Sequence, residues 1–198
     1  MKDAPGGVSA TTSSEVIAAS ARLIAEKGIA DFEIADVADE LGVEPRHIRY
    51  WFISEADVLA ALMTLRQERF LEEMQTYSGE APSHAARLRK LFDISVADYD
   101  ATLWIELWKL GLREPVALEC RQRVNDRYCE LITRMIRAGQ SAGEFGDAPA
   151  AQIATALAAL IVGLAVQATL RDPLVTPEYM RSTLIWATES LLAADLSE

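Results

Sequence analysis

The sequence predicts an all-α protein in which three short N-terminal helices precede a larger helical body, with about nine helices altogether. Alanine and leucine dominate the chain, whereas only 10 glycines and 7 prolines occur in 198 residues. Apolar residues recur at intervals of three and four, and the β-branched alternation typical of strands is nearly absent. Because 51% of the residues are hydrophobic, the chain can bury a sizeable core and is too apolar for a disordered protein.

A capping pattern predicts the first helix. Thr12 and Glu15 have the Thr-x-x-Glu spacing in which each side chain can bond the other residue's backbone N–H group. Apolar residues then recur at helical spacing as far as Gly28, a residue type that commonly ends helices. We expect residues 1–12 to form a flexible tail, since they are small and polar and lack the apolar stretch of a signal peptide.

Two shorter helices are predicted next, joined by a tight turn. The first covers residues 34–41 and places its apolar residues on one face: Ile34, Val37, Ala38 and Leu41. Gly42 supplies the turn, and Pro45 suits the first position of the following helix, at about 45–51. We expect this third helix to bury Ile48, Trp51 and Phe52.

The rest of the chain predicts six further helices. Ser54 and Asp57 repeat the capping spacing at the start of a long helix that runs to about residue 77. The stretch 78–83 (SGEAPS) is a loop, and helices are then expected at about 84–99, 102–112, 115–142, 149–171 and 177–194. The segment 150–170 is strongly apolar, but we expect a buried helix there and no membrane span, because it also carries polar residues: Gln152, Thr155, Gln167 and Thr169.

This arrangement resembles the TetR family of one-component repressors. In the N-terminal part the resemblance is carried by Ile34, Ala38, Gly42, Val43, Ile48, Phe52 and Leu59. Three stretches of the body, residues 103–124, 136–145 and 159–178, resemble the BetI-like subclass of TetR C-terminal domains. The resemblance implies a helix-turn-helix DNA-binding head at 1–54 and a ligand-binding and dimerisation body at 55–198. It also implies a cytoplasmic homodimer that binds a pseudo-palindromic DNA operator and is modulated by a small, mostly apolar effector.

In that family the third helix enters the major groove of DNA. On this sequence the exposed face of that helix would be Arg46, His47, Arg49 and Tyr50. A guanidinium group matches guanine edges and phosphates as a fork, and histidine and tyrosine add hydrogen bonds or stacking. The alternative interpretation is that these side chains form only the solvated face of a small helix.

The charge of the head departs from the family pattern. The family usually has small hydroxyl residues where Glu33 and Glu44 stand, a tyrosine where Arg49 stands and a lysine where Glu55 stands. Those positions typically contact phosphate, and an acidic side chain repels phosphate. Residues 15–60 hold four basic side chains against ten acidic ones, and the whole chain has a formal net charge of −11. Arg46 and Arg49 would therefore supply most of the favourable contacts to DNA. The alternative is a degenerate family member that binds an effector or a protein but no DNA.

An effector pocket is predicted in the middle of the chain, where large aromatic and sulfur-containing side chains gather. The predicted lining is Phe70, Met74, Phe92, Tyr99, Trp104, Trp108 and Tyr128, and the candidate polar anchors are Asn125, Gln167 and Thr133. Regulators of the resembled type enclose their effector in such a space, and pockets of this kind are mostly apolar with few polar anchors. An ordinary hydrophobic core is the alternative interpretation of the same residues.

The last two helices predict a homodimer interface, because they are apolar nearly all round and one subunit of this size has no room to bury both faces. The residues assigned to this interface are Ile153, Leu157, Leu160, Ile161, Leu164, Leu184 and Trp186. The alternative interpretation is that both helices pack entirely within the subunit.

One string imitates a catalytic motif. Residues 139–143 read Gly-x-Ser-x-Gly, but that motif activates its serine only on a strand-to-helix turn with a histidine and an acid nearby. We expect a helix end here and no enzymatic activity, which sets aside a small helical enzyme. Cys120 and Cys129 fit neither a metal spacing nor a disulfide framework, so we expect reduced thiols, no metal and no cofactor.

Overall fold

The computed structural model describes residues 12–28, 31–78, 81–97 and 100–196 of the chain. Within these ranges it contains nine α-helices and no β-strand: α1 (Ser13–Lys27), α2 (Ile34–Leu41), α3 (Pro45–Trp51), α4 (Glu55–Ser78), α5 (His84–Ala97), α6 (Thr102–Gly111), α7 (Pro115–Ser141), α8 (Ala150–Thr169) and α9 (Pro177–Leu192). The predicted fold class is confirmed, and the predicted helix ends differ from these by at most about two residues.

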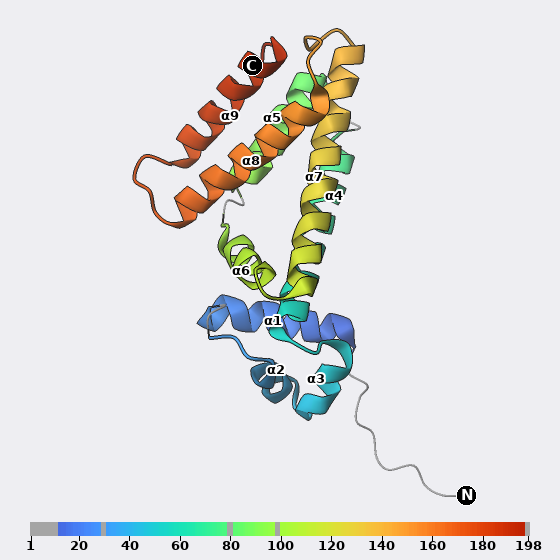
Figure 1. The fold of residues 1–198 in the computed structure, drawn as a ribbon, viewed down its shortest axis with the longest axis vertical. Helices are drawn as coiled ribbons and strands as arrows, with labels where there is room; N and C mark the ends of the chain where they lie inside the picture. The colour runs from blue at the N-terminus through green and yellow to red at the C-terminus, as the bar shows by residue number, and fades with distance from the viewer. Residues whose placement is uncertain (1–11, 29–30, 79–80, 98–99, 197–198) are drawn as a thin grey trace, which may run out of the picture.

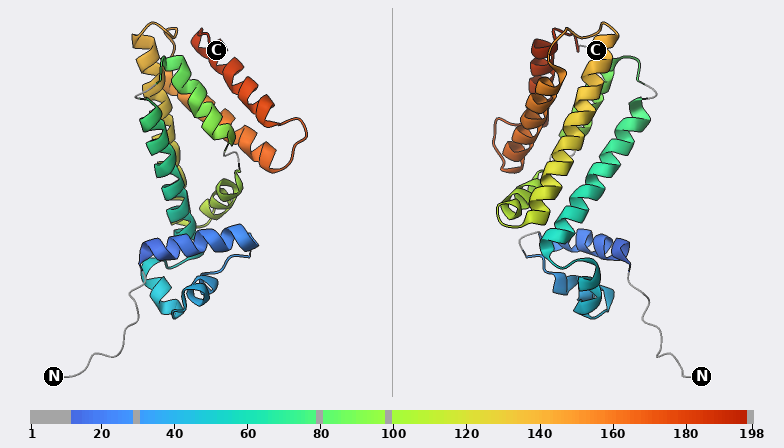
Figure 2. Two further views of the ribbon diagram at one scale, coloured as in Figure 1. Left: turned by 180° about the vertical axis from the view of Figure 1, so that it is seen from behind. Right: turned by 45° about the vertical axis from the view of Figure 1, so that its right-hand side comes forward.

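The helices form an elongated molecule with a small head and a larger body (Figure 1). Helices α1, α2 and α3 form the head, and the long helices α4 and α7 rise side by side from it through the body. Helices α5, α8 and α9 pack around their far ends, whereas α6 lies next to the head, as the additional views show (Figure 2). The body is therefore joined to the head through α4 and α6.

Local capping explains where the head helices begin. The Thr12 hydroxyl accepts a hydrogen bond from the Glu15 N–H group at 3.3 Å, and the Glu15 carboxylate accepts one from the Thr12 N–H group at 2.8 Å. The predicted capping box is therefore present, and Ser54 with Asp57 forms the equivalent one before α4. Gly42 ends α2 in the left-handed conformation, with φ of 63°, which glycine adopts at little cost.

The hydrophobic core of the head extends into the body. Ile34, Val37 and Ile48 from α2 and α3 are buried against side chains of α1 and α4. The first turns of α4 contribute Val58, Leu59 and Leu62, and α6 packs Leu103 and Leu110 against the same cluster. The expectation that Trp51 is buried is wrong, since it is 44% exposed at the end of α3. Only one narrow face of the short α3 contacts the core of the head, and Ile48 and Phe52 occupy that face.

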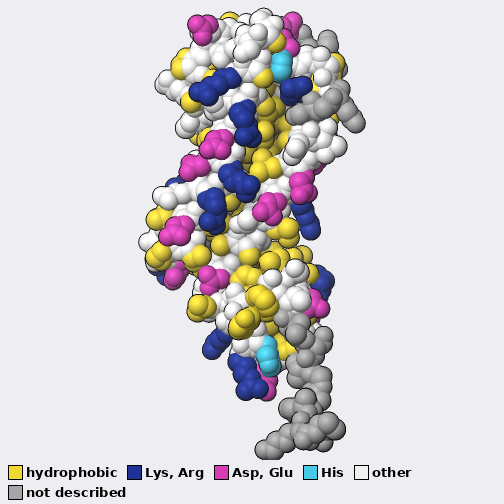
Figure 3. Space-filling view, turned by 90° about the vertical axis from the view of Figure 1, so that its right-hand side faces the viewer, with side chains coloured by type: hydrophobic (Ala, Val, Ile, Leu, Met, Phe, Trp, Pro, Cys, Tyr) yellow, Lys and Arg dark blue, Asp and Glu magenta, His cyan; other side chains and the backbone are white. Residues whose placement is uncertain are grey.

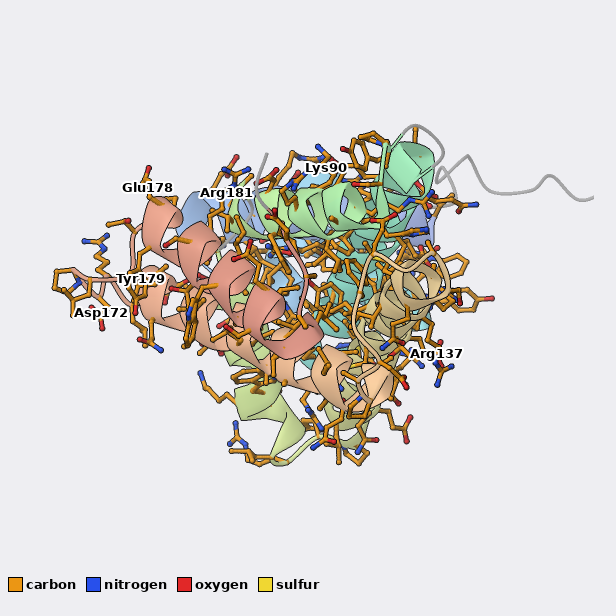
Figure 4. The ribbon with its side chains drawn as sticks, turned by 90° about the horizontal axis from the view of Figure 1, so that it is seen from above. Lys90, Arg137, Asp172, Glu178, Tyr179 and Arg181 are labelled. Carbon is orange, nitrogen blue, oxygen red and sulfur yellow. The ribbon has the colours of Figure 1, made fainter. Side chains whose placement is uncertain are left out.

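The core of the body lies where α5, α7, α8 and α9 meet. Phe92, Ile136, Leu157 and Leu184 are fully buried there, one from each helix. The Arg181 guanidinium of α9 pairs with the Asp93 carboxylate of α5 at 2.6 Å. Figure 4 shows Arg181 on the side of α9 that faces α5, whereas Tyr179 lies on another side of the same helix.

The Gly-x-Ser-x-Gly string forms the end of α7. Gly143 has φ of 75°, its N–H group bonds the Gln140 carbonyl, and the Glu144 N–H group bonds the Gly139 carbonyl. These two bonds make a Schellman motif, the helix end that glycine favours. The hydroxyl of Ser141 donates to the Arg137 carbonyl at 2.9 Å and is therefore engaged with its own helix.

Helix α8 is the one described helix that is long and apolar enough to cross a membrane by length and composition. About half of its most apolar stretch (44%) is buried inside the subunit, where it packs against α7 and α9. The remaining face is lined by small residues, among them Ala156, Ala159 and Gly163. A Cβ atom added at Gly163 would meet no neighbouring atom within 4 Å, so this face is uncovered in the single subunit.

Candidate functional site

Five helices line a partly open cavity of about 130 Å³ in the body, hereafter the inner cavity. It is lined from α4 by Met63, Arg66, Gln67 and Phe70, from α5 by Ile94 and Ser95, from α6 and the residues before it by Asp100, Ala101 and Trp104, from α7 by Val124, Asn125 and Tyr128, and from α8 by Ile161, Val162 and Ala165. On α4 the lining residues Met63, Gln67 and Phe70 are four and three positions apart, so they share one helix face.

Three aromatic side chains shape the walls of the inner cavity. Phe70 and Tyr128 lie with their ring centroids 5.5 Å apart, and Trp104 faces the same space from α6. The Tyr128 hydroxyl is hydrogen-bonded to the Ser95 hydroxyl at 3.1 Å. Enclosure of this phenol raises its pKa well above its usual range, and the bond from Ser95 offsets only part of that rise, so Tyr128 is neutral.

The polar part of the inner cavity includes the Gln67 amide, the Asp100 carboxylate and the Arg66 guanidinium. The buried Gln67 side chain donates through Nε2 to the Val124 carbonyl at 2.5 Å, while its Oε1 has no hydrogen-bond partner among the described residues. At the rim, Asp100 accepts bonds from the Thr102 hydroxyl at 2.6 Å and the Thr102 N–H group at 2.9 Å. These bonds hold the pKa of the Asp100 carboxyl below its usual value, so Asp100 is ionised, and the Arg66 guanidinium lies at the same rim.

Asp100 and Ala101, which border the inner cavity, are hydrogen-bonded to two helices. The Arg66 guanidinium of α4 donates to the backbone carbonyl of Asp100 at 3.1 Å. The Ala101 N–H group donates to the Thr169 hydroxyl of α8 at 2.8 Å. Arg66 is therefore directed at the rim, and Trp104 enters the cavity one helical turn after an anchored residue.

Four of the predicted lining residues border the inner cavity: Phe70, Trp104, Asn125 and Tyr128. Met74 and Phe92 do not, because they are fully buried farther up the body, where α5 packs on α4, α7 and α8. Trp108 is 38% exposed, Gln167 is exposed and Thr133 bonds the Cys129 carbonyl, so none of these three side chains lines the cavity. Tyr99 lies outside the described residues.

Several lining residues escaped the sequence analysis, notably Gln67, Ser95 and Asp100. Gln67 carried a usable signal, since it is a polar residue in the stripe that connects Met63 with Phe70 on α4. Ser95 and Asp100 carried none, because hydroxyl and carboxylate side chains are ordinary on an exposed helix or before one. In the described ranges no three His, Cys, Asp or Glu side chains converge as metal ligands.

The exposed face of α3 presents Arg46, Arg49 and Tyr50, which is 78% exposed. The Arg46 guanidinium is paired with the Glu44 carboxylate at 3.1 Å. His47 is only half exposed, and its Nδ1 atom is buried without a hydrogen-bond partner, so its ring is turned partly toward the head. Basic side chains lie beside an acidic one and a histidine at the end of the head (Figure 3).

The other two cations of the head are paired as well. Arg22 of α1 forms an ion pair with Glu40 of α2, and Lys27 pairs with Asp36 at 2.7 Å. Both pairs connect α1 to α2. Among the described residues, Arg49 is the one basic side chain of the head that forms no ion pair.

The residues predicted for the dimer interface divide into two groups. Ile153, Leu157, Ile161, Leu164 and Leu184 are buried inside the subunit, so for these five side chains the prediction of an exposed interface is wrong. They face inward because α5 and α7 cover that side of α8 and α9. Leu160 is half buried and Trp186 is 68% exposed. The exposed large side chains on α9 are Tyr179, Trp186 and Leu191.

Comparison with known families accounts for both parts of the molecule. Residues 84–193 match the family described as "BetI-type transcriptional repressor, C-terminal", and residues 16–62 match "Bacterial regulatory proteins, tetR family". The chain belongs to the TetR family. It is a TetR-family transcriptional regulator with a BetI-type C-terminal domain, as the sequence predicted, and the members of this family are regulators and not enzymes.

Relatives with known names or structures agree with this assignment. The fatty acid metabolism regulator protein of Bacillus subtilis (strain 168) is 24% identical over 140 residues, which are 67% of this chain and 70% of that protein. A transcriptional regulator from Saccharomonospora viridis, solved in complex with choline, is 26% identical, with a TM-score of 0.75 over 86% of this chain and 92% of the other. A TetR regulator from Haloarcula marismortui shares the fold, with a TM-score of 0.78 at 23% identity over 90% of this chain and 97% of the other.

Proposed function

We propose that the protein is a cytoplasmic, homodimeric TetR-family repressor whose affinity for operator DNA changes when a small effector binds in the inner cavity. The observation that carries this proposal is the position of α6. Trp104 of α6 lines the inner cavity, while Leu103 and Leu110 of the same short helix pack against the core of the head. An effector that displaces Trp104 therefore acts on a helix that also supports the head.

The effector is a compact, largely apolar cation. At about 130 Å³ the inner cavity is smaller than the roughly 300–1,000 Å³ typical of drug-sized ligands. Aromatic faces from Phe70, Trp104 and Tyr128 surround it and an ionised Asp100 lies at its rim, the combination that recognises ammonium groups. The related regulator solved with choline supports this class. An acyl chain, which the name of the Bacillus subtilis relative suggests, would meet a carboxylate at the rim.

Effector binding and DNA affinity are coupled if the head can take two positions relative to the body. If the effector binds one head position more tightly than the other, it shifts the population toward that position by its differential affinity. The Asp100–Ala101 segment supports this, because it is bonded both to Arg66 of α4 and to Thr169 of α8. A molecule entering beside it changes contacts on α4, whose first turns belong to the core of the head.

The DNA contacts are proposed for Arg46, Arg49 and Tyr50, which are exposed on α3. A dimer would place two such helices in successive major grooves of a pseudo-palindromic operator. We propose the uncovered face of α8 together with the exposed side chains of α9, Tyr179 and Trp186, as the dimer contact. A degenerate head that binds no DNA is the second candidate, which the pairing of Arg46 with Glu44 favours.

Choline binding tests the effector proposal. Choline should change tryptophan emission and raise the melting temperature by mass action. Trp104→Ala should weaken choline binding about thirtyfold, since an enclosed cation–aromatic contact is worth roughly 2 kcal/mol. Asp100→Asn should also weaken it, because the carboxylate no longer attracts the ammonium group. Trp51→Ala is the control, because Trp51 lies in the head outside the cavity lining, and it should leave the affinity unchanged. Equal effects of both tryptophan variants would contradict this location.

A gel-shift series separates the two candidates for the head. The full-length protein is mixed with the DNA that flanks its own gene at several salt concentrations. A DNA-binding repressor should form a complex with this DNA at low salt, and choline should weaken or strengthen that complex. Absence of any complex at the lowest salt, with choline binding intact, would support the degenerate head.

A further inference from the structure

A second and larger hollow, which is open to solvent, lies at the junction of head and body. It has a volume of about 730 Å³ and lies between α1 and α4, with one residue each from α5 and α6 at its margin; we call it the junction groove. Its lining is mainly apolar and includes Ile17 and Ala18 of α1 and Leu65 and Phe70 of α4. This volume falls within the roughly 300–1,000 Å³ of sites for drug-sized molecules.

The charged side chains of the junction groove favour an anion. Arg66, Arg69 and Glu73 are the three charged residues in its lining. The Glu73 carboxylate is paired with the Lys90 ammonium group of α5 at 3.6 Å, so its charge is opposed from outside the groove. Arg69 is exposed and forms no ion pair within the described part of the chain. A guanidinium group binds a carboxylate through two parallel hydrogen bonds.

The junction groove and the inner cavity are neighbours that differ in charge. Phe70, Ile94 and Arg66 line both, so these three side chains form the wall between them. In the inner cavity Arg66 stands against the Asp100 carboxylate, whereas the groove adds Arg69 and holds one carboxylate, Glu73, that is paired from outside. The surplus of positive charge therefore lies on the groove side of the wall.

We propose that the junction groove binds a single-chain amphiphile with one anionic group, such as a long-chain carboxylate. The carboxylate pairs with Arg69 at the edge, and the chain lies on the apolar surface between α1 and α4. Since α1 belongs to the head and α4 continues into the body, this ligand contacts both parts at once. If this ligand favours one position of α1 against α4, it changes the DNA affinity, and DNA changes the ligand affinity by the same factor.

Calorimetry on the full-length dimer tests the proposal with three probes of equal chain length, each below its micellar concentration. Dodecanoate should bind at least tenfold more tightly than dodecanol or dodecyltrimethylammonium, because only the carboxylate pairs with Arg69. Arg69→Glu should weaken dodecanoate at least tenfold. Arg134→Glu makes the same charge change at an exposed position of α7 outside the groove and should have no effect.

A steric pair of variants locates the chain. Ala18→Trp fills the groove and should abolish dodecanoate binding, whereas Ala25→Trp, an exposed alanine of α1 outside the lining, should not. Melting temperatures confirm that both variants fold. The proposal is overturned if dodecanoate binds no better than the other probes, or if Arg69→Glu and Ala18→Trp leave its affinity unchanged. Loss of dodecanoate binding through Trp104→Ala alone would place the molecule in the inner cavity and also overturn it.

Discussion

Glu44 and Arg46 form an ion pair across 3.1 Å at the start of α3, and their side chains are 63% and 73% exposed. An exposed pair of this kind adds little to stability, typically about 0–1 kcal/mol. If α3 enters the major groove as proposed, the Glu44 carboxylate competes with phosphate for one of the two arginines on that helix. Glu44 would therefore lower the DNA affinity in two ways: it repels phosphate, and it occupies the Arg46 guanidinium.

Replacing Glu44 with glutamine should strengthen DNA binding. Glu44→Gln removes one negative charge per subunit and releases Arg46, so we expect the affinity of the dimer to rise by roughly tenfold at low salt. Fluorescence anisotropy on DNA flanking the gene measures this. Glu119→Gln, which neutralises an exposed acid on α7, should leave the affinity unchanged. Equal affinities of Glu44→Gln and the parent protein would show that Arg46 does not contact DNA.

Reversing the charge at Glu55 should change the salt dependence of DNA binding. Glu55 is exposed in the first turn of α4, whereas the cap of that helix is made by Ser54 and Asp57, so the helix start survives the change. If both lysines of a Glu55→Lys dimer reach phosphate, the slope of log K against log salt should steepen by about 1.8. An unchanged slope, measured by the same anisotropy assay, would mean that the start of α4 does not face the DNA backbone.

The dimer contact can be tested at Trp186. Because this side chain is 68% exposed in the subunit, Trp186→Asp should fold normally, but in the dimer it would bury an unpaired charge. Sedimentation should therefore show monomers at micromolar concentration. Leu112→Asp, which alters an 85% exposed leucine at the end of α6, serves as the control and should remain dimeric. A dimeric Trp186→Asp protein would exclude this side of α9 from the interface.

Glu144 should stabilise the body from a distance in sequence. Its carboxylate accepts hydrogen bonds from the N–H groups of His84 at 2.7 Å and Ala85 at 3.0 Å and so caps α5. Glu144→Ala should lower the free energy of unfolding by about 1–2 kcal/mol. Urea denaturation at fixed protein concentration measures the loss. Glu119→Ala, at an exposed position of α7, is the neutral control. A difference below about 0.3 kcal/mol would show that water replaces this cap.

Tyr128 predicts a loss of stability at alkaline pH. Its raised pKa means that the folded protein requires the neutral phenol, so its contribution is intact below the ordinary value of about 10 and is lost as the pH rises beyond it. Tyr128→Phe should lower the free energy of unfolding by about 1 kcal/mol at pH 8, because the hydrogen bond to Ser95 is lost. The difference in free energy of unfolding between this variant and the parent protein should be smaller at pH 11. Ser95→Ala keeps the phenol, so the difference in free energy of unfolding between this variant and the parent protein should not become smaller at pH 11.

The sequence predicted the helices because their ends are local features. The capping pairs at Thr12 and Ser54, the turn at Gly42 and the prolines that begin α3, α7 and α9 act within one or two helical turns. Burial around the inner cavity depends instead on how helices cross. Phe70 and Met74 are four positions apart on α4, yet Phe70 lines the cavity and Met74 is fully buried in the core. No pattern along the chain separates them.

Helix α8 shows the same limit for the dimer surface. It is apolar on every side, so periodicity alone did not reveal which face α5 and α7 cover. The structure assigns the large residues, such as Leu157 and Leu164, to the inside and leaves alanines and Gly163 outside. Side-chain size was the available signal, since helices approach closely where their residues are small.

The packing of Leu103 and Leu110 against the head restricts how such regulators can be recombined. A hybrid that joins a foreign head to this body at residue 54 would retain two leucines shaped to the original head, while the incoming head would lose its own partners on α6. Such a chimera would repress poorly even with every DNA contact intact. The exchangeable module is therefore discontinuous in the chain: it comprises α1 to α3, the first two turns of α4 and one face of α6.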